Sequence, residues 1–237
     1  MIDIIQQYWR PFLWSDGYHL SGLAVTMWLL VLSIAFGFVV SIPLAVARVS
    51  KVKWLARSVW FYTYVFRGTP LYVQLLFFYT GMYSLDAVRE VGFLNHFFRE
   101  GYNCTILAFA LNTCAYTTEI FAGAIKATPY GEIEAGRAYG MNKFTLYRRV
   151  IIPSALRRAL PAYSNEVILM LHATTVAFTA TVPDILKVAR DVNAATYDSF
   201  NAFGLAALIY LSVTFILVGL FRKAETRWLA YLQPTKH

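Results

Sequence analysis

Long apolar runs alternate with short polar segments along the 237-residue chain. The first run, residues 22–47, contains no charged side chain and exceeds the ~20 residues that a helix needs to cross a bilayer. Further runs lie within 58–85, within about 104–125, from Pro161 to about Val182, and from Phe200 to Phe221. The pattern predicts an all-α polytopic membrane protein with five transmembrane helices.

Basic residues gather in alternate connections between these runs. The connection between the first and second runs, the connection between the third and fourth, and the segment after the fifth are rich in Lys and Arg. The other connections and the first 21 residues carry little excess of base. By the positive-inside rule, the N-terminus is predicted to lie in the periplasm and the C-terminus in the cytoplasm.

Composition agrees with a membrane protein, because 58% of the residues are hydrophobic and only 14% are charged. The net charge of +8 follows the loops, so it does not indicate a nucleic-acid partner. The N-terminal stretch lacks a basic region before an apolar core, so no cleaved signal peptide is expected. Cys104 and Cys114 lie among apolar residues without metal-ligand spacing and are expected to be buried thiols.

The polar stretch 131–153 separates the third and fourth apolar runs. It predicts two short helices, the first of which ends at a left-handed Gly140. Asn142 is expected to cap the second helix, and Pro153 is expected to end the segment. On periodicity alone, a surface hairpin without a special role remains as good an interpretation as a functional segment.

The residues of this stretch resemble the EAA loop of ABC-importer permeases. Glu134-Ala135-Gly136 is followed after three residues by Gly140 and after nine more by Val150-Ile151-Ile152-Pro153. The family pattern is Glu-Ala-Ala, three residues, Gly, nine residues, then Ile, any residue, Leu-Pro, so Gly136 is the main departure. The resemblance implies a coupling helix that docks on a separate cytoplasmic ATPase. It assigns ATPase coupling to Glu134, Ala135, Gly136, Gly140 and Pro153.

The second apolar run contains Arg67-Gly68-Thr69-Pro70, which is similar to a stretch in the polar amino-acid branch of these permeases. Gly68 and Pro70 are expected to break the helix, with Thr69 capping a new start. The break is interpreted either as an elbow at the cytoplasmic surface, which we favour, or as a half-helix whose N-terminus faces an anionic group of a solute.

Polar residues in the third and fourth runs are candidates for the solute path. They are Glu119, Asn165, Glu166 and His172, and Thr69 joins them from the second run. A carboxylate within a span is costly unless it is paired, is protonated or faces a wet cavity. In the amino-acid branch an Arg usually follows three residues after the first Glu. Ala122 stands at that position here, so Glu119 is expected to lack its usual partner.

The related stretch of the fourth run usually carries Lys where this chain has His172. Together with Ala122, this suggests a path made less positive so that a cationic solute is not repelled. Since like charges at close range interact as strongly as unlike ones, Ala122→Arg is expected to depress lysine or arginine uptake more than ATPase assembly.

The resemblance extends over nearly the whole chain. It implies a periplasmic segment 1–21, a permease domain 22–222 and a cytoplasmic tail 223–237 in the bacterial inner membrane. The partners implied are a homologous or identical permease subunit, two ABC ATPase subunits, a periplasmic amino-acid-binding protein and membrane lipid. ATP and magnesium belong to the ATPase, so no cofactor is expected here and the chain is not an enzyme. The solute is expected to be histidine, lysine, arginine or ornithine, with a neutral polar amino acid as the alternative.

Two other function classes are less well supported. A proton-coupled secondary transporter would use Glu119, Glu166 and His172 as a relay, but no inverted repeat is visible. A membrane enzyme would need a clustered catalytic set, and no nucleophile or metal motif is found. The segment 182–199 is interpreted either as a plain loop or as a gate or docking surface outside the membrane.

Overall fold

The computed structural model describes residues 2–229, and these residues form helices with no strand. Two isolated β-bridges join Ser15 to Leu20 and Gly22 to Asp184. The predicted all-α class is therefore confirmed for the described part of the chain. The helices are α1 Ile2–Leu13, α2 Gly22–Arg48, α3 Lys53–Gly68, α4 Leu71–Leu76, η1 Phe77–Gly81, η2 Met82–Ser84, α5 Asp86–Glu90, α6 Gly92–Arg99, α7 Gly101–Lys126, α8 Tyr130–Ala138, α9 Lys143–Leu146, η3 Tyr147–Ile151, α10 Ile152–Ala173, η4 Thr174–Ala180, α11 Ile185–Thr196 and α12 Ser199–Trp228.

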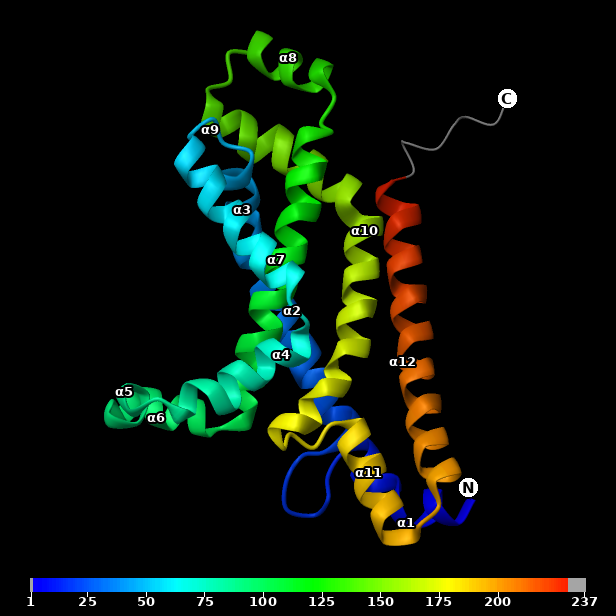
Figure 1. The fold of residues 1–237 in the computed structure, drawn as a ribbon. Coiled ribbons are helices and arrows are strands. Elements are labelled where there is room, and N and C mark those ends of the chain that lie inside the picture. The colour runs from blue at the N-terminus through cyan, green and yellow to red at the C-terminus, as the bar shows by residue number, and fades with distance from the viewer. Residues whose placement is uncertain (1, 230–237) are drawn as a thin grey trace.

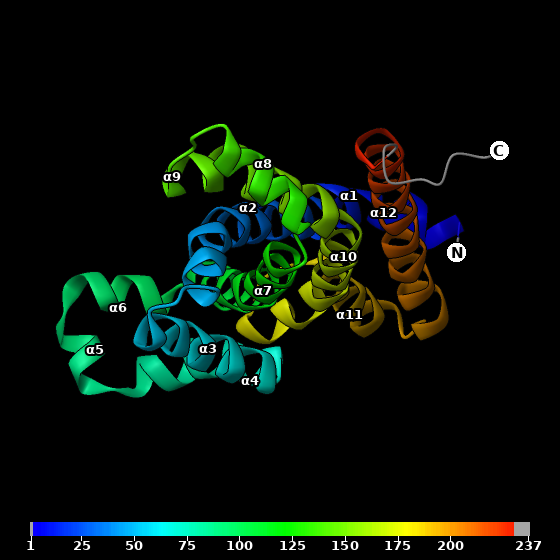
Figure 2. The same cartoon turned by 90° about the horizontal axis from the view of Figure 1, so that it is seen from above.

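The long helices α2, α7 and α10 form the body of the molecule, with α7 between the other two (Figures 1 and 2). Their contact faces bury apolar side chains such as Leu29, Phe109 and Leu171, all fully inaccessible. α12 stands at one edge, where it contacts α10 and α11. The core therefore lies along α7 rather than around all the long helices equally.

Each predicted apolar run is helical, with differences at the ends. α2 and α12 are by themselves long and apolar enough to cross a membrane. α12 continues to Trp228, past the predicted boundary at Phe221 and into the predicted tail. Residues 230–237 of that tail lie outside the described residues. The second run is divided among α3, α4, η1 and η2 instead of forming one continuous span.

Short helices occupy both ends of the bundle (Figure 1). α8 and α9 lie at the top of the view, and α1 and α11 lie at the bottom. Most of the segment 182–199 is the helix α11, so the interpretation as a plain loop is wrong. Asp184 caps this helix, since its carboxylate accepts hydrogen bonds from the backbone N–H of Lys187 at 2.9 Å and of Leu186 at 3.2 Å.

Candidate functional site

The first candidate site is the α8–α9 segment, where the end of α8 has the predicted left-handed glycine. Gly140 has φ +74°, a conformation that L-residues with a side chain rarely adopt. Its N–H donates to the Arg137 carbonyl at 2.9 Å, and the Met141 N–H donates to the Gly136 carbonyl at 3.1 Å. These two bonds form a Schellman motif that ends the helix. Asn142 then caps α9 by accepting from the Thr145 N–H at 2.9 Å, as predicted.

Gly136, the departure from the family pattern, lies where α8 crosses the following helix. It is buried, and a Cβ at this position would be 2.5 Å from Cδ1 of Leu146. The neighbouring Glu134 and Ala135 are exposed. The glycine therefore permits close packing of α8 on the chain that follows it, while the rest of the motif remains accessible.

The prediction that Pro153 ends the segment is wrong. α9, η3 and α10 follow one another without a break from Lys143 to Ala173, and Pro153 lies inside this helical stretch. The turn just before it, Tyr147–Ile151, is a π-helix. A proline lacks the N–H that an α-helix would use, and a wider turn accommodates that loss without ending the helix.

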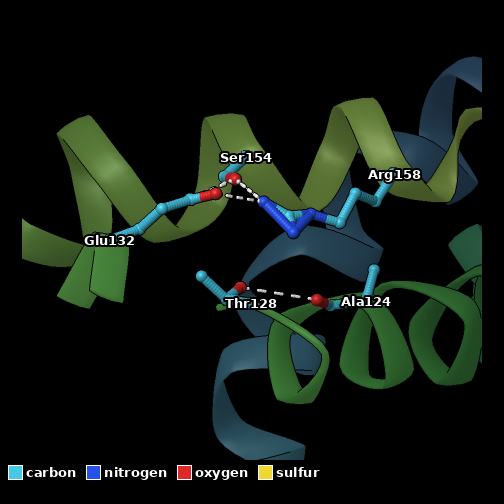
Figure 3. Close-up of polar contacts among 5 residues, drawn as sticks. All are labelled: Ala124, Thr128, Glu132, Ser154 and Arg158. Atoms are coloured by element: carbon cyan, nitrogen blue, oxygen red, sulfur yellow. Dashed lines mark hydrogen bonds and ion pairs between the residues drawn. The ribbon is translucent and has the colours of Figure 1, made fainter. Parts of the chain in front are cut away.

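A polar network joins the start of α8 to the start of α10 (Figure 3). The Glu132 carboxylate accepts from Ser154 Oγ at 2.6 Å through Oε2 and from the Arg158 guanidinium through Oε1. The same Arg158 nitrogen, Nη2, donates to Ser154 Oγ at 2.6 Å. This network was not predicted from the sequence, because Ser154 and Arg158 are 22 and 26 residues from Glu132.

The α8–α9 segment carries exposed aromatic side chains. Tyr139 is 85% exposed and Phe144 is 74% exposed, and Tyr130 at the start of α8 is also exposed. Large exposed aromatics beside exposed Glu134 and Ala135 are typical of a surface that another protein covers.

The second candidate site is a cavity of about 430 Å³ beside the break between α3 and α4. Its polar lining comes from Arg67, Thr69, Asn112, Tyr116 and Glu166. Glu166 is only 6% exposed and accepts a hydrogen bond from Thr113 Oγ1 at 3.2 Å. The cavity therefore places a buried carboxylate and a guanidinium around one space.

The break lies beside the middle of α7, so the favoured elbow at the cytoplasmic surface is wrong. Asn112 Nδ2 donates to the Phe66 carbonyl at 3.2 Å, and Tyr116 donates to the Arg67 carbonyl at 3.3 Å. The Arg67 guanidinium lies 5.2 Å from the centre of the Tyr116 ring. Thr69 does not cap α4, because its hydroxyl donates back to the Val65 carbonyl at 2.9 Å.

Glu119 lacks the usual partner at position 122, as predicted, but it is paired with residues of two other helices. Its Oε1 accepts from Arg48 Nε and from Thr63 Oγ1, both at 2.7 Å. Arg48 is the last residue of α2, so the cation comes from another helix instead of from the position of Ala122. Ala122 is 1% exposed within an apolar cluster and does not line the cavity.

Of the predicted path residues, the cavity brings together Thr69 and Glu166. Asn165 and His172 are exposed elsewhere on α10, and His172 Nε2 lies 3.3 Å from Thr214 Oγ1 of α12. Arg67, Asn112 and Tyr116 complete the polar lining. Asn112 was not predictable as a candidate from the sequence, since one Asn in an apolar run carries no motif.

Comparisons with known proteins agree with the family resemblance. Residues 33–230 match the family described as "Binding-protein-dependent transport system inner membrane component". The chain is 62% identical to the histidine/lysine/arginine/ornithine transport system permease protein HisM of Escherichia coli K12 over 99% of both chains. It is 42% identical to the octopine transport system permease protein OccM of Rhizobium radiobacter, over 90% of this chain and 87% of that protein.

Solved structures share the fold. An amino acid ABC transporter crystallised with histidines superposes with a TM-score of 0.74 at 30% identity, over 85% of this chain and 90% of that one. A chain of the inward-facing MetNI methionine ABC transporter superposes with a TM-score of 0.72 at 17% identity, over 87% of this chain and 94% of that one, which shows the fold alone. The chain therefore belongs to the inner membrane components of binding-protein-dependent transport systems, as a permease subunit and not an enzyme.

Proposed function

We propose that this chain is the transmembrane permease subunit of an ATP-driven importer of cationic amino acids such as histidine, lysine, arginine and ornithine. The observation that carries the proposal is the near-full-length identity of 62% to the HisM permease protein. The cavity chemistry supports it independently of that relationship.

A cationic amino acid carries a carboxylate at one end and a positive group at the other. Glu166 offers a negative partner for the positive group, and Arg67 offers a partner for the carboxylate. Because Glu166 is buried, a charge left unpaired beside it would be costly. A neutral amino acid has only its α-ammonium group, next to the carboxylate, whereas a cationic one adds a side-chain cation that can reach Glu166 while Arg67 binds the carboxylate. The cavity chemistry therefore favours a cationic solute.

The α8–α9 segment is the proposed docking surface for the ATPase. Its motif residues Glu134 and Ala135 and its aromatic residues Tyr139 and Phe144 are exposed. By the positive-inside rule, the basic connections favour a cytoplasmic position for this end and a periplasmic position for the N-terminus. ATP and magnesium would bind to the ATPase, and a second permease subunit and a periplasmic binding protein would complete the importer.

Uptake by the complete importer in proteoliposomes tests the proposal. With ATP inside, labelled lysine is expected to accumulate, and a proton ionophore is expected to leave accumulation intact. Glu166→Gln should lower lysine uptake about tenfold, which corresponds to ~1.4 kcal/mol of lost interaction. His172→Gln is the matched control because His172 lies on the same helix outside the cavity.

Two results would contradict this function. Uptake that survives ATP depletion but collapses with the proton gradient would indicate a secondary transporter. Equal uptake of lysine by the Glu166→Gln and His172→Gln importers would exclude Glu166 from recognition of the cation.

A further inference from the structure

Within residues 2–229, α8 has few contacts outside its own segment. Its main neighbours are α9 and η3, which follow it directly in sequence. Figure 1 shows α8 beyond the ends of α7 and α10, joined by short loops to α7 and to α9. Movement of α8 therefore reaches the long helices through its flanking loops and through whatever side chains cross to them.

The path along the backbone from α8 to α10 is irregular. It runs through the left-handed turn at Gly140, the four-residue helix α9 and the π-turn Tyr147–Ile151. Turns of this kind have weaker or shifted hydrogen bonding, so they transmit force poorly along a helix axis. A direct side-chain connection across this stretch would transmit force more effectively.

Glu132, Ser154 and Arg158 form such a connection (Figure 3). Glu132 belongs to the first turn of α8, and Ser154 and Arg158 lie one turn apart on the first part of α10. The Glu132 side chain is 36% exposed and the Arg158 side chain is 15% exposed. The ion pair is thus partly shielded from water, where charge-assisted hydrogen bonds are stronger than at an open surface.

The network is anchored on the helix that carries the cavity carboxylate. Arg158 and Glu166 are both on α10, about two helical turns apart. Pro161 lies between them, where a helix lacks one backbone hydrogen bond and bends with less resistance. A displacement of Arg158 is therefore expected to move the segment of α10 that positions Glu166.

We propose that Glu132, Ser154 and Arg158 are positioning residues that transmit the movement of α8 directly to α10 and so couple ATP hydrolysis to opening of the solute cavity. This proposal rests on the proposed function of the chain as an importer subunit. Glu132 and Arg158 need not touch the ATPase or the solute, because they act through the helices that do.

The test measures both lysine uptake and ATP hydrolysis by the complete importer in proteoliposomes. Glu132→Gln and Arg158→Gln are expected to lower the uptake per ATP hydrolysed at least fivefold, while the ATPase stays bound and hydrolyses ATP. Ser154→Ala should lower this ratio less, because the ion pair remains. Arg157→Gln is the matched control, since Arg157 is the exposed neighbour of Arg158 and makes no contact in the network.

The charge exchange Glu132→Arg with Arg158→Glu provides a readout that a folding defect would not give. If the network transmits movement, each single exchange should lower the uptake per ATP hydrolysed. The double variant should then regain at least half of the uptake per ATP that the single exchanges lose. If both Gln variants keep the wild-type uptake per ATP hydrolysed, the proposal is overturned. It is also overturned if the variants lose ATPase binding and uptake together and the double charge exchange restores neither. An absence of ATP-driven uptake in the wild-type importer would instead refute the proposed function.

Discussion

The two ends of the helical bundle are attached to it in opposite ways (Figure 1). At one end, α11 buries Ile185, Val188 and Ala189 against α1, α2 and α12 in a single apolar cluster. At the other end, α8 buries Gly136 against Leu146 but leaves Glu134 exposed. α11 is thus held by many apolar contacts, whereas α8 is held mainly by its packing on α9 and η3 and by one polar network.

This difference indicates different mechanical roles for the two ends. An element with a large buried apolar face opens only at a cost close to that of global unfolding. An element with few buried contacts changes its arrangement at low cost, which is required of a segment that makes different contacts in two states. α11 is therefore expected to move with the bundle, and α8 is expected to move relative to it.

The largest effect is expected from deleting a buried phenylalanine ring at the α11 end, and the matching deletion at the α8–α9 end should have almost none. Phe12 is 1% exposed and packs with α11, so Phe12→Ala should lower the free energy of unfolding by about 3 kcal/mol or more. Phe144 is 74% exposed, so Phe144→Ala should change it by less than about 0.5 kcal/mol. Thermal unfolding of the purified chain in detergent compares the two directly.

The same pair also separates stability from partner binding. If α8–α9 is the docking surface, Phe144→Ala should weaken ATPase binding in a pull-down even though it leaves the chain stable. Phe12→Ala protein that remains folded at low temperature should bind the ATPase normally. The reverse result for either variant would contradict the comparison between the two ends.

A smaller effect is expected from the buried carboxylate at the start of α11. Burial raises the pKa of Asp184 to about 6 from its usual 3.8, although the N–H groups of Lys187 and Leu186 and the Tyr210 hydroxyl favour the charged form. A carboxyl whose pKa is higher in the folded state binds more protons there, so its contribution to stability falls as the pH rises from about 4 to 6. At neutral pH this contribution has been lost.

Lowering the pH from 7.5 to 5 should therefore recover about 1.4 kcal/mol of stability at Asp184. Asp184→Asn keeps a capping oxygen but cannot ionise, so the pH dependence of its unfolding should be smaller by this amount. Melting curves of both proteins at the two pH values give the difference. Identical pH dependence in the two proteins would show that Asp184 does not titrate in this range.

An effect of about 1 kcal/mol is expected at the end of α8. Gly140→Ala places a side chain in the left-handed region, which costs on the order of 1 kcal/mol. Because α8 is loosely attached, this loss should appear as faster hydrogen exchange of its own amides and not as lower stability of the bundle. Gly140→Asn is the control, since Asn tolerates this conformation better than Ala. Equal exchange in all three proteins would contradict the assigned conformation.

The features that were predictable from sequence are mainly local. The left-handed Gly140 and the Asn142 cap depend on neighbouring residues, and both predictions are confirmed. The apolar runs likewise depend on local composition, and they are helical as expected. Pro153 is the local exception, because the π-turn before it lets the helix continue although proline has no backbone N–H.

The pairing of polar side chains within the bundle was not predictable in this way. Arg48 and Glu119 are 71 residues apart, so no short motif connects them. The position of Arg67 beside the middle of α7 depends on how α3 packs against α7, and periodicity does not determine that packing. The cavity was therefore predicted only through Thr69 and Glu166, and its other polar residues required the three-dimensional structure.

The smallest effect is expected where the chain departs from the family motif. Gly136→Ala restores the usual Ala, but its Cβ would lie 2.5 Å from Leu146 Cδ1. That atom is the end of a flexible side chain, so a rotamer change should limit the cost to about 0.5–1 kcal/mol in α8. The shorter side chain of Leu146→Val should remove most of this cost in a double-mutant cycle. A loss of several kcal/mol that Leu146→Val does not relieve would show that α8 is held more rigidly than its contacts indicate.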